Sequence, residues 1–434
     1  MSTPAARAAA PVALPSPARP AGRARARDGL VLAVAARAAG VALGFGTAVA
    51  LARGLGAEAR GTFALCVAYA EITATLSSVG VHEAVAVHTA RGARAPAAIL
   101  GTGMGLSGLT GILAALLAAL AILSGGLPLP NGAVSVGLAA LLAVPFLRLH
   151  HVVGAFLRGR NDFAAFALVQ VARSLLTLLA VVVGVVALDL GLPAAAAAFV
   201  LAAAIPSIAG ARRAARDVGR PRLDAATARE TVGFGLRGWP GAIASILSRR
   251  LDLVLLAGFV AAEPIGHYVV ATQIAEVLLY FPSAATMVLL PWTSAATLPS
   301  SRGIPEGVRA WFGRIAALHL ALCALAAWGA PLLGPLLLET LFGPEYVPAI
   351  EPLRWLVPAA LLLGFSLLLG SVLTGVGRPG ANALAGFAGL LAAVPAYLLL
   401  VPRWGIRGAA LGSAIAYGVQ AGAQAILLLR RRSR

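Results

Sequence analysis

Long runs of apolar residues, each about 20 residues or more, recur along the chain from near residue 29 to residue 429. A helix of that length crosses about 30 Å of hydrocarbon at ~1.5 Å per residue. Breaking the runs at glycines, prolines and clusters of charge predicts twelve spanning helices. Their approximate limits are 29–52, 60–82, 98–124, 132–156, 163–188, 192–211, 232–259, 264–290, 310–338, 352–376, 380–401 and 408–429. The pattern predicts an all-α membrane protein.

The longest polar interruption falls in the middle of the chain and separates two halves of six predicted helices. It carries Arg212, Arg213, Arg216, Arg220, Arg222 and Arg229. We interpret residues 212–231 as a basic cytoplasmic linker between an N-terminal lobe, 29–211, and a C-terminal lobe, 232–429. Residues 1–28, rich in Ala, Pro and Arg, are interpreted as a disordered cytoplasmic tail, and 430–434 as a basic cytoplasmic tail.

The two halves share a sequence repeat. Ala57-Glu58-Ala59-Arg60-Gly61-Thr62-Phe63 is matched 205 residues later by Ala262-Glu263-Pro264-Ile265-Gly266-His267-Tyr268, and Ala70-Glu71 is matched at the same offset by Ala275-Glu276. Six predicted helices separate the matching segments, so the repeat is parallel. Two pseudo-symmetric lobes of this kind leave a central cleft at their interface, where transporters place their substrates.

Composition and charge agree with a membrane protein, since 60% of the residues are hydrophobic and 12% are charged. The net charge is +18, and every basic residue is Arg. Because the arginines lie between and beside apolar runs, we interpret them as topology signals and expect no nucleic-acid partner. The absence of Lys excludes a phosphate-loop ATPase and a Schiff-base enzyme. The Arg- and Ala-rich composition favours a bacterial inner membrane.

The distribution of arginines predicts that both termini are cytoplasmic. With the N-terminus inside, about 23 arginines fall on cytoplasmic segments and about five on external ones. The external ones are Arg53, Arg60, Arg354, Arg403 and Arg407.

Charged residues inside the predicted helices are candidate site residues, because each costs roughly 2.5 to 3.5 kcal/mol to insert. They are Arg37, Arg148, Arg173, Arg237, Arg249, Arg250, Glu71, Asp252 and Glu276. Arg37 and Arg173 lie deepest, about 13 to 15 Å inside their helices. A guanidinium also suits an anionic phosphate group, because it donates two parallel hydrogen bonds and keeps its charge.

Structural roles remain open for several of these residues. Arg249 and Asp252 are three apart on one helix and can neutralise each other, whereas Arg250 lacks a local partner. Arg148 and Arg237 lie near cytoplasmic helix ends and can extend to water. Glu71 and Glu276 occupy equivalent places in the two lobes and either pair with buried arginines or titrate during transport.

Neither the cysteines nor the histidines predict a metal or a cofactor. Cys66 and Cys323 lack paired spacing, and His150, His151 and His319 lack metal-ligand spacing. We expect these side chains to pack between helices, and we expect no catalytic residue.

Three groups of residues resemble the oligosaccharide flippases, the polysaccharide biosynthesis and export proteins of the superfamily that also contains multidrug and toxin extrusion transporters. The first is Leu51-Ala52-Arg53-Gly54-Leu55-Gly56-Ala57-Glu58-Ala59-Arg60-Gly61, and the second is Arg249-Arg250-Leu251-Asp252 with Gly266-His267-Tyr268 and Leu289-Leu290-Pro291. The third is Leu341-Phe342-Gly343-Pro344-Glu345-Tyr346, Gly375-Val376-Gly377-Arg378-Pro379 and Pro402-Arg403-Trp404-Gly405-Ile406-Arg407-Gly408-Ala409-Ala410. Their order and spacing cover nearly the whole chain after the tail.

The resemblance implies a transporter that flips an isoprenoid-pyrophosphate-linked oligosaccharide to the external leaflet by alternating access. Together with the buried charges, it makes Arg37, Arg173, Arg249 and Arg250 candidate pyrophosphate ligands. The implied partners are the lipid-linked oligosaccharide and membrane lipids, with the glycosyltransferases and glycan polymerase of the same pathway as further candidates. Two alternatives are a cation-coupled multidrug exporter of the same superfamily and a membrane glycosyltransferase or polymerase. The excess of Arg over acid and the short external loops disfavour both.

Overall fold

The computed structural model describes residues 23–92, 94–130, 132–296 and 306–429, which are helical and contain no strand. Its elements are α1 (Arg23–Leu76), α2 (Val81–Arg91), α3 (Pro96–Leu123), α4 (Val134–Leu141), α5 (Val144–Gly159), α6 (Phe163–Val181), η1 (Val182–Ala187), α7 (Gly191–Val218), α8 (Ala225–Leu256), α9 (Ala262–Val277), α10 (Tyr280–Ala296), α11 (Glu306–Leu341), η2 (Pro344–Ala349), α12 (Ile350–Gly375) and α13 (Pro379–Leu429). Residues 1–22 and 430–434 of the predicted tails lie outside the described residues. The predicted tail 1–28 is too long at its C-terminal end, because α1 already begins at Arg23.

These elements make the twelve predicted spans. Eight helical segments are long and apolar enough to cross a membrane, and the bent pair α9 and α10 makes a ninth. Helices α1 and α13 each contain two spans, because the backbone turns at Gly56 and at Gly405. Helix α8, which carries several arginines, is the remaining one. The fold class is therefore confirmed as an all-α, multi-pass membrane protein.

The turn inside α1 has a local cause in Gly56. Its backbone adopts φ 76° and ψ 169°, a conformation that side-chain-bearing residues rarely adopt. The first half of α1 therefore ends at Gly56, and the second half returns across the molecule to Leu76, followed by α2. We call the end of the molecule at this turn the Gly56 end and the opposite end, where α1 gives way to α2, the Gly80 end.

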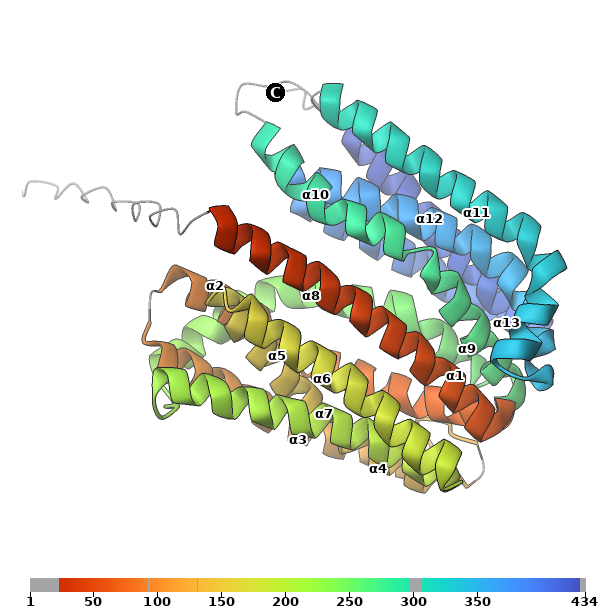
Figure 1. Ribbon diagram of the computed structural model, residues 1–434, viewed down its shortest axis with the longest axis horizontal. Helices are drawn as coiled ribbons and strands as arrows, with labels where there is room; N and C mark the ends of the chain where they lie inside the picture. The colour runs from red at the N-terminus through yellow and green to blue at the C-terminus, as the bar shows by residue number, and fades with distance from the viewer. Residues whose placement is uncertain (1–22, 93, 131, 297–305, 430–434) are drawn as a thin grey trace, which may run out of the picture.

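The helices form two groups with α1 running between them (Figure 1). Helix α1 packs against α6 of the N-terminal lobe and against α9 of the C-terminal lobe. The largest core cluster crosses this boundary, since it combines Ala52, Ala64 and Ala68 of α1 with Tyr268 and Val270 of α9. Small residues allow the two helices to approach closely, which is how helices associate where lipid removes the hydrophobic driving force.

Backbone contacts through glycine close the lobes against each other at both ends. At the Gly56 end, a Cβ at Gly61 would overlap the Ala262 carbonyl and lie 2.7 Å from the Gly266 nitrogen. At the Gly80 end, a Cβ at Gly235 of α8 would overlap the Val79 carbonyl and lie 2.7 Å from the carbonyl carbon of Gly80. The two lobes therefore touch at both ends of their interface, through α9 at the Gly56 end and through α8 at the Gly80 end.

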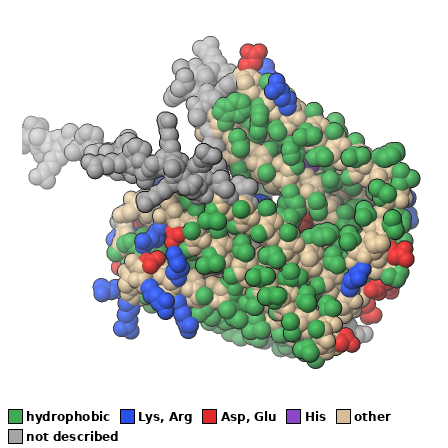
Figure 2. Space-filling view, viewed as in Figure 1, with side chains coloured by type: hydrophobic (Ala, Val, Ile, Leu, Met, Phe, Trp, Pro, Cys, Tyr) green, Lys and Arg blue, Asp and Glu red, His purple; other side chains and the backbone are tan. Residues whose placement is uncertain are grey.

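The outer surface is apolar around the middle of the molecule and charged at its ends (Figure 2). Exposed leucines cover the outward faces of the long helices, as in α3 (Leu109, Leu113, Leu117) and α11. Basic side chains gather at the Gly80 end, at the left of Figure 2, and acidic ones at the Gly56 end. An apolar belt between charged ends is the surface that a bilayer requires.

The predicted linker 212–231 is mostly helical. Helix α7 continues to Val218 and α8 begins at Ala225, which leaves residues 219–224 between them. Asp224 caps α8, because its carboxylate accepts a hydrogen bond from the Thr227 backbone nitrogen at 2.7 Å. The arginines of the predicted linker therefore lie mostly on the helices α7 and α8.

Candidate functional site

An ion pair joins the two lobes near the centre of their interface. Arg250 of α8 donates from Nε to the Glu71 carboxylate of α1 at 2.8 Å. About a third of each side chain is exposed, at 33% for Arg250 and 29% for Glu71. Arg250 had no partner on its own helix, and the fold supplies one from the other lobe.

Further arginines and one further carboxylate surround this pair. Arg173 of α6 is half-buried and interacts electrostatically with Glu71. Arg249 interacts with both Glu71 and Glu276, although its hydrogen bond goes to the Ser245 hydroxyl on its own helix. Glu276, the repeat equivalent of Glu71, is exposed and accepts no hydrogen bond or ion pair from the described residues. The interface thus gathers Arg173, Arg249 and Arg250 around two carboxylates.

An apolar cleft of about 940 Å³ adjoins this cluster between α1, α9, α11 and α12. Phe45, Trp328, Leu337 and Val357 contribute to its walls, and Glu276 reaches it from α9. Arg37 is exposed and lies one helical turn before Val41, which lines the cleft. Arg37 also interacts electrostatically with Tyr280 at the cleft margin. It is therefore placed on the cleft side of α1, apart from the other three arginines.

Asp252 does not neutralise Arg249, although the two are three residues apart on one helix. Asp252 is buried, and its carboxylate accepts hydrogen bonds from the Tyr268 hydroxyl at 2.7 Å and from the Leu253 nitrogen at 2.8 Å. The local ion pair that the spacing allowed is not formed, because Asp252 bonds Tyr268 of α9 while Arg249 bonds Ser245.

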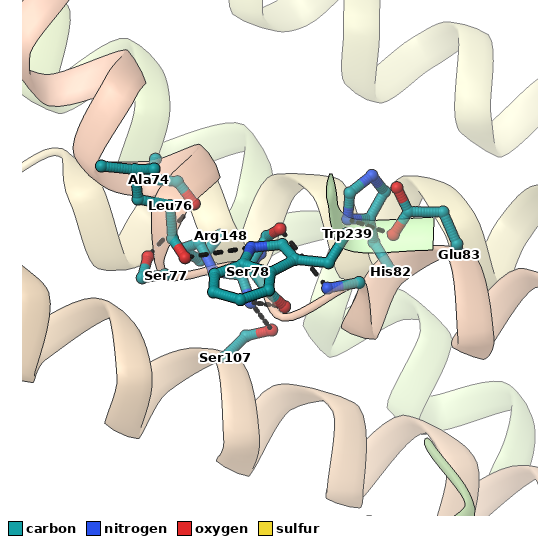
Figure 3. Close-up of polar contacts among 10 residues, drawn as sticks. Ala74, Leu76, Ser77, Ser78, His82, Glu83, Ser107, Arg148 and Trp239 are labelled. Carbon is teal, nitrogen blue, oxygen red and sulfur yellow. Dashed lines mark hydrogen bonds and ion pairs between the residues drawn. The ribbon is translucent and has the colours of Figure 1, made fainter. Parts of the chain in front are cut away.

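Arg148 is a structural residue at the Gly80 end (Figure 3). It is fully buried and donates to the Ser78 carbonyl at 3.0 Å and to the Ser107 hydroxyl at 3.2 Å. The Ser78 carbonyl belongs to the break between α1 and α2, so the guanidinium satisfies a carbonyl that the helix leaves free. The sequence allowed Arg148 to extend to water, but the side chain does not do so.

The same break carries a hydrogen bond between the lobes. Figure 3 shows the Trp239 indole of α8 beside it, and its Nε1 donates to the Leu76 carbonyl at 3.1 Å. Nearby, Arg94 pairs with Glu230 of α8. That hydrogen bond lowers the pKa of Glu230 below its ordinary value and raises the pKa of Arg94. These contacts hold α8 to the N-terminal lobe, whereas Arg237 is exposed on the same helix.

Arg60 was expected at the start of the second span, 60–82, and was counted among the external arginines. It lies in the first turn of the second half of α1, but it is buried, at 4% exposed. The sequence repeat could have indicated that Arg60 is buried, because the residue equivalent to Arg60 in the other lobe is Ile265, which is also buried.

The arrangement has the charge to bind an anion. Three guanidinium groups around two carboxylates leave positive charge at the lobe boundary, beside an apolar cleft. No group of His, Cys, Asp or Glu in the described part of the chain has the geometry of a metal site.

Solved structures with this fold are membrane transporters of one superfamily. The chain is similar to the lipid II flippase MurJ in an inward closed conformation, with a TM-score of 0.75 and 11% identity over 92% of this chain and 87% of that one. It is also similar to an inward-facing multidrug resistance MATE transporter, with a TM-score of 0.68 and 20% identity over 89% and 93%. A superfamily transporter from Pyrococcus furiosus gives a TM-score of 0.64 at 19% identity over 93% and 94%.

Sequence comparison agrees with this fold. An uncharacterized membrane protein of Methanocaldococcus jannaschii is 25% identical over 191 residues, 44% of this chain, and the match spans 37% of that relative's length. Residues 27–297, more than half of the chain, match the family described as polysaccharide biosynthesis protein. The chain therefore belongs to the polysaccharide biosynthesis protein family.

Proposed function

We propose that the protein flips an isoprenoid-pyrophosphate-linked oligosaccharide from the cytoplasmic to the external leaflet of a bacterial inner membrane. The two lobes open alternately at the Gly80 end and at the Gly56 end. The protein binds and releases its cargo without making or breaking a covalent bond. Glycosyltransferases would supply this cargo, and a glycan polymerase would consume it.

The observation that carries the proposal is the imbalance of charge at the lobe interface. Arg173, Arg249 and Arg250 face Glu71 and Glu276, and Arg37 lies on the same side of α1 as the cleft. A pyrophosphate diester brings negative charge and several acceptor oxygens, which match guanidinium groups. The ion pair with Glu71 is the contact that a phosphate would replace on Arg250.

The apolar cleft supports a lipid-linked cargo. Its walls come from α1, α9, α11 and α12, so it adjoins the arginine cluster through Glu276. An isoprenoid chain can lie against apolar walls while its charged head is held at the lobe interface.

The basic surface supports an orientation for this proposal. Arginine-rich ends of membrane proteins stay in the cytoplasm, so we propose that the Gly80 end faces the cytoplasm and the Gly56 end faces outward. The contacts between the lobes at these two ends would then be the cytoplasmic and the external gates.

The experiment is lipid flipping in proteoliposomes that contain the full chain and a fluorescent polyprenyl-pyrophosphate disaccharide. Replacing Arg37, Arg173 and Arg250 together by Gln is expected to reduce the rate by about a thousandfold or more, since each hydrogen bond to a charged group contributes about 1.5 to 3 kcal/mol and each 1.36 kcal/mol is a factor of ten. Arg212→Gln, on the predicted linker, is the control and keeps the wild-type rate. Undiminished flipping by the triple variant would contradict the proposal.

A second candidate function is export of lipophilic cations. The observation that favours it is Glu276, a carboxylate without an ion pair or hydrogen bond among the described residues, on the wall of a largely apolar cleft. Ethidium efflux from cells that express the protein, abolished by Glu276→Gln, would support this function. Efflux at the background level together with lipid flipping would exclude it.

A further inference from the structure

Arg60 is a buried cation without a partner. The side chain is 4% exposed, and its Nε is sealed from solvent. The described residues give the side chain neither a hydrogen bond nor an ion pair, so no protein group compensates the sealed Nε. Burial of an uncompensated charge is costly, and proteins retain such groups rarely.

The position itself disfavours a cation. In the C-terminal lobe the equivalent residue is Ile265, which is 1% exposed, so the repeat places an apolar side chain here. Arg60 also lies in the first turn after the break at Gly56, where the helix dipole favours a negative group. A second guanidinium, that of Arg250, repels it electrostatically. Packing and helix electrostatics therefore both fail to explain Arg60.

Other charged residues at the Gly56 end are satisfied. Arg53 donates to the carbonyls of Thr340 and Leu341, and Arg407 pairs with Glu351. The Glu345 carboxylate accepts from the Ala57 backbone nitrogen at 3.3 Å, so it is engaged at the start of the helix. Arg60 differs from these neighbours because no hydrogen bond or ion pair with a described residue holds it in place.

The closed lobes cover Arg60. The next residue, Gly61, touches the backbone of α9 at Ala262 and Gly266, and this contact has to separate when the lobes part at the Gly56 end. Separation would expose a guanidinium that has no hydrogen bond or ion pair with a described residue. In the described conformation Arg60 interacts electrostatically with Arg250, whose present partner is Glu71.

We propose that Arg60 is a phosphate-binding residue at the Gly56 end of the lobe interface and that, with Arg250, it receives the pyrophosphate group of the cargo when this end opens. The proposal rests on the proposed function and adds a residue and a step to it. Arg250 serves first in the central cluster and then, released from Glu71, beside Arg60. The two guanidiniums that repel each other in the empty protein are brought together by the bound anion.

The test uses the purified full chain in nanodiscs, with geranylgeranyl pyrophosphate as the probe and thermal unfolding as the readout. Arg60→Met removes the charge and resembles the apolar residue of the other lobe. We expect its unfolding temperature without ligand to equal or exceed that of the wild type, and its affinity for the probe to fall about tenfold. Arg60→Lys keeps the charge but loses the guanidinium fork, and we expect an intermediate affinity.

Arg53→Gln is the matched control, since this arginine lies at the same end but makes structural hydrogen bonds. It should lower the unfolding temperature and leave the affinity unchanged. Wild-type affinity in Arg60→Met would overturn the inference while the proposed function stands. Should that variant fail to fold, the affinity of Arg60→Lys decides, and an unchanged value would again contradict the inference.

Two further ligands separate the possible sources of the phosphate. Geranylgeranyl monophosphate and phosphatidylglycerol should stabilise the wild type less than the pyrophosphate does. Equal stabilisation by phosphatidylglycerol would assign Arg60 to a membrane lipid and overturn its role toward the cargo. If the wild type binds no pyrophosphate, the proposed function fails, and this inference fails with it.

Discussion

Glu71 and Glu276 occupy equivalent positions in the two lobes but have different partners. Glu71 accepts an ion pair from Arg250 at 2.8 Å, whereas Glu276 faces the apolar cleft and has no ion-pair partner among the described residues. The repeat therefore supplies two carboxylates, of which one links the lobes and the other does not.

This difference predicts that neutralising Glu71 changes the affinity for a phosphate ligand more than neutralising Glu276 does. Glu71→Gln frees Arg250 for an incoming phosphate, so the affinity for geranylgeranyl pyrophosphate should rise about two- to fivefold, the range of a half-exposed ion pair. Glu276→Gln leaves the ion pair intact and should change the affinity less. Titration of the probe against both variants in nanodiscs checks this. Weaker binding by Glu71→Gln would show that the carboxylate contacts the ligand rather than competing with it.

The sequence predicted the twelve spans because the length of an apolar run is a local property. Helix α3, for example, was expected over 98–124 and covers Pro96–Leu123. The break between α1 and α2 was not predicted, because the Ser78 carbonyl is satisfied by Arg148 from a distant helix. The continuation of α7 to Val218, past the predicted end of the span at residue 211, was also not predicted, because the prediction relied on the length of the apolar run.

The charged residues of the site could be selected from the sequence, but their partners could not. Spacing along one helix suggested that Arg249 pairs with Asp252, whereas the fold gives Asp252 to Tyr268. Arg250 pairs with Glu71, 179 residues away, which no local pattern encodes. The burial of Arg60 was not predicted, because the polar residues around Gly56 indicated a longer loop than the sharp turn that the backbone makes there.

The glycine contact at the Gly80 end predicts a conformational effect of one added methyl group. Gly235→Ala places a Cβ into the Val79 and Gly80 backbone, and overpacking of this kind costs about 1 to 3 kcal/mol. The Gly80 end should therefore open. Spin labels at the exposed residues Arg91 and Arg229 should move apart. Gly238→Ala, where no atom lies within 4 Å of the added Cβ, is the control and should leave the distance unchanged. Equal distances in both variants would argue against a sealed contact.

The equivalent substitution at the other end should have the opposite result. Gly266→Ala places a Cβ against the Ala57 carbonyl, so the Gly56 end should open while the Gly80 end stays closed. Labels at Glu58 and Glu263, which are both exposed, report on this end. Opening at both ends in Gly266→Ala would contradict independent gates.

The ion pair between Arg94 and Glu230 predicts a pH dependence of closure at the Gly80 end. Arg94 lowers the pKa of Glu230 in the closed state. A lowered pKa contributes stability that is fully present above the ordinary Glu pKa, 4.5, and is lost as the pH falls through the lowered value. The labels at the Gly80 end should therefore separate as the pH falls below about 4.5. Glu230→Gln should remove this dependence, and a transition that persists in the variant would assign it to another group.

The indole of Trp239 predicts a second, pH-independent contribution to the same closure. Its Nε1 donates to the Leu76 carbonyl, a group that the end of α1 leaves free for a partner. Trp239→Phe keeps an aromatic ring but loses the donor, so closure should weaken by about 0.5 to 1.5 kcal/mol. The labels should report more of the open form at pH 7. Trp404→Phe is the control, because this indole is 54% exposed and forms no hydrogen bond with the described residues. A Trp239→Phe variant that closes like the wild type would show that glycine packing alone holds the Gly80 end.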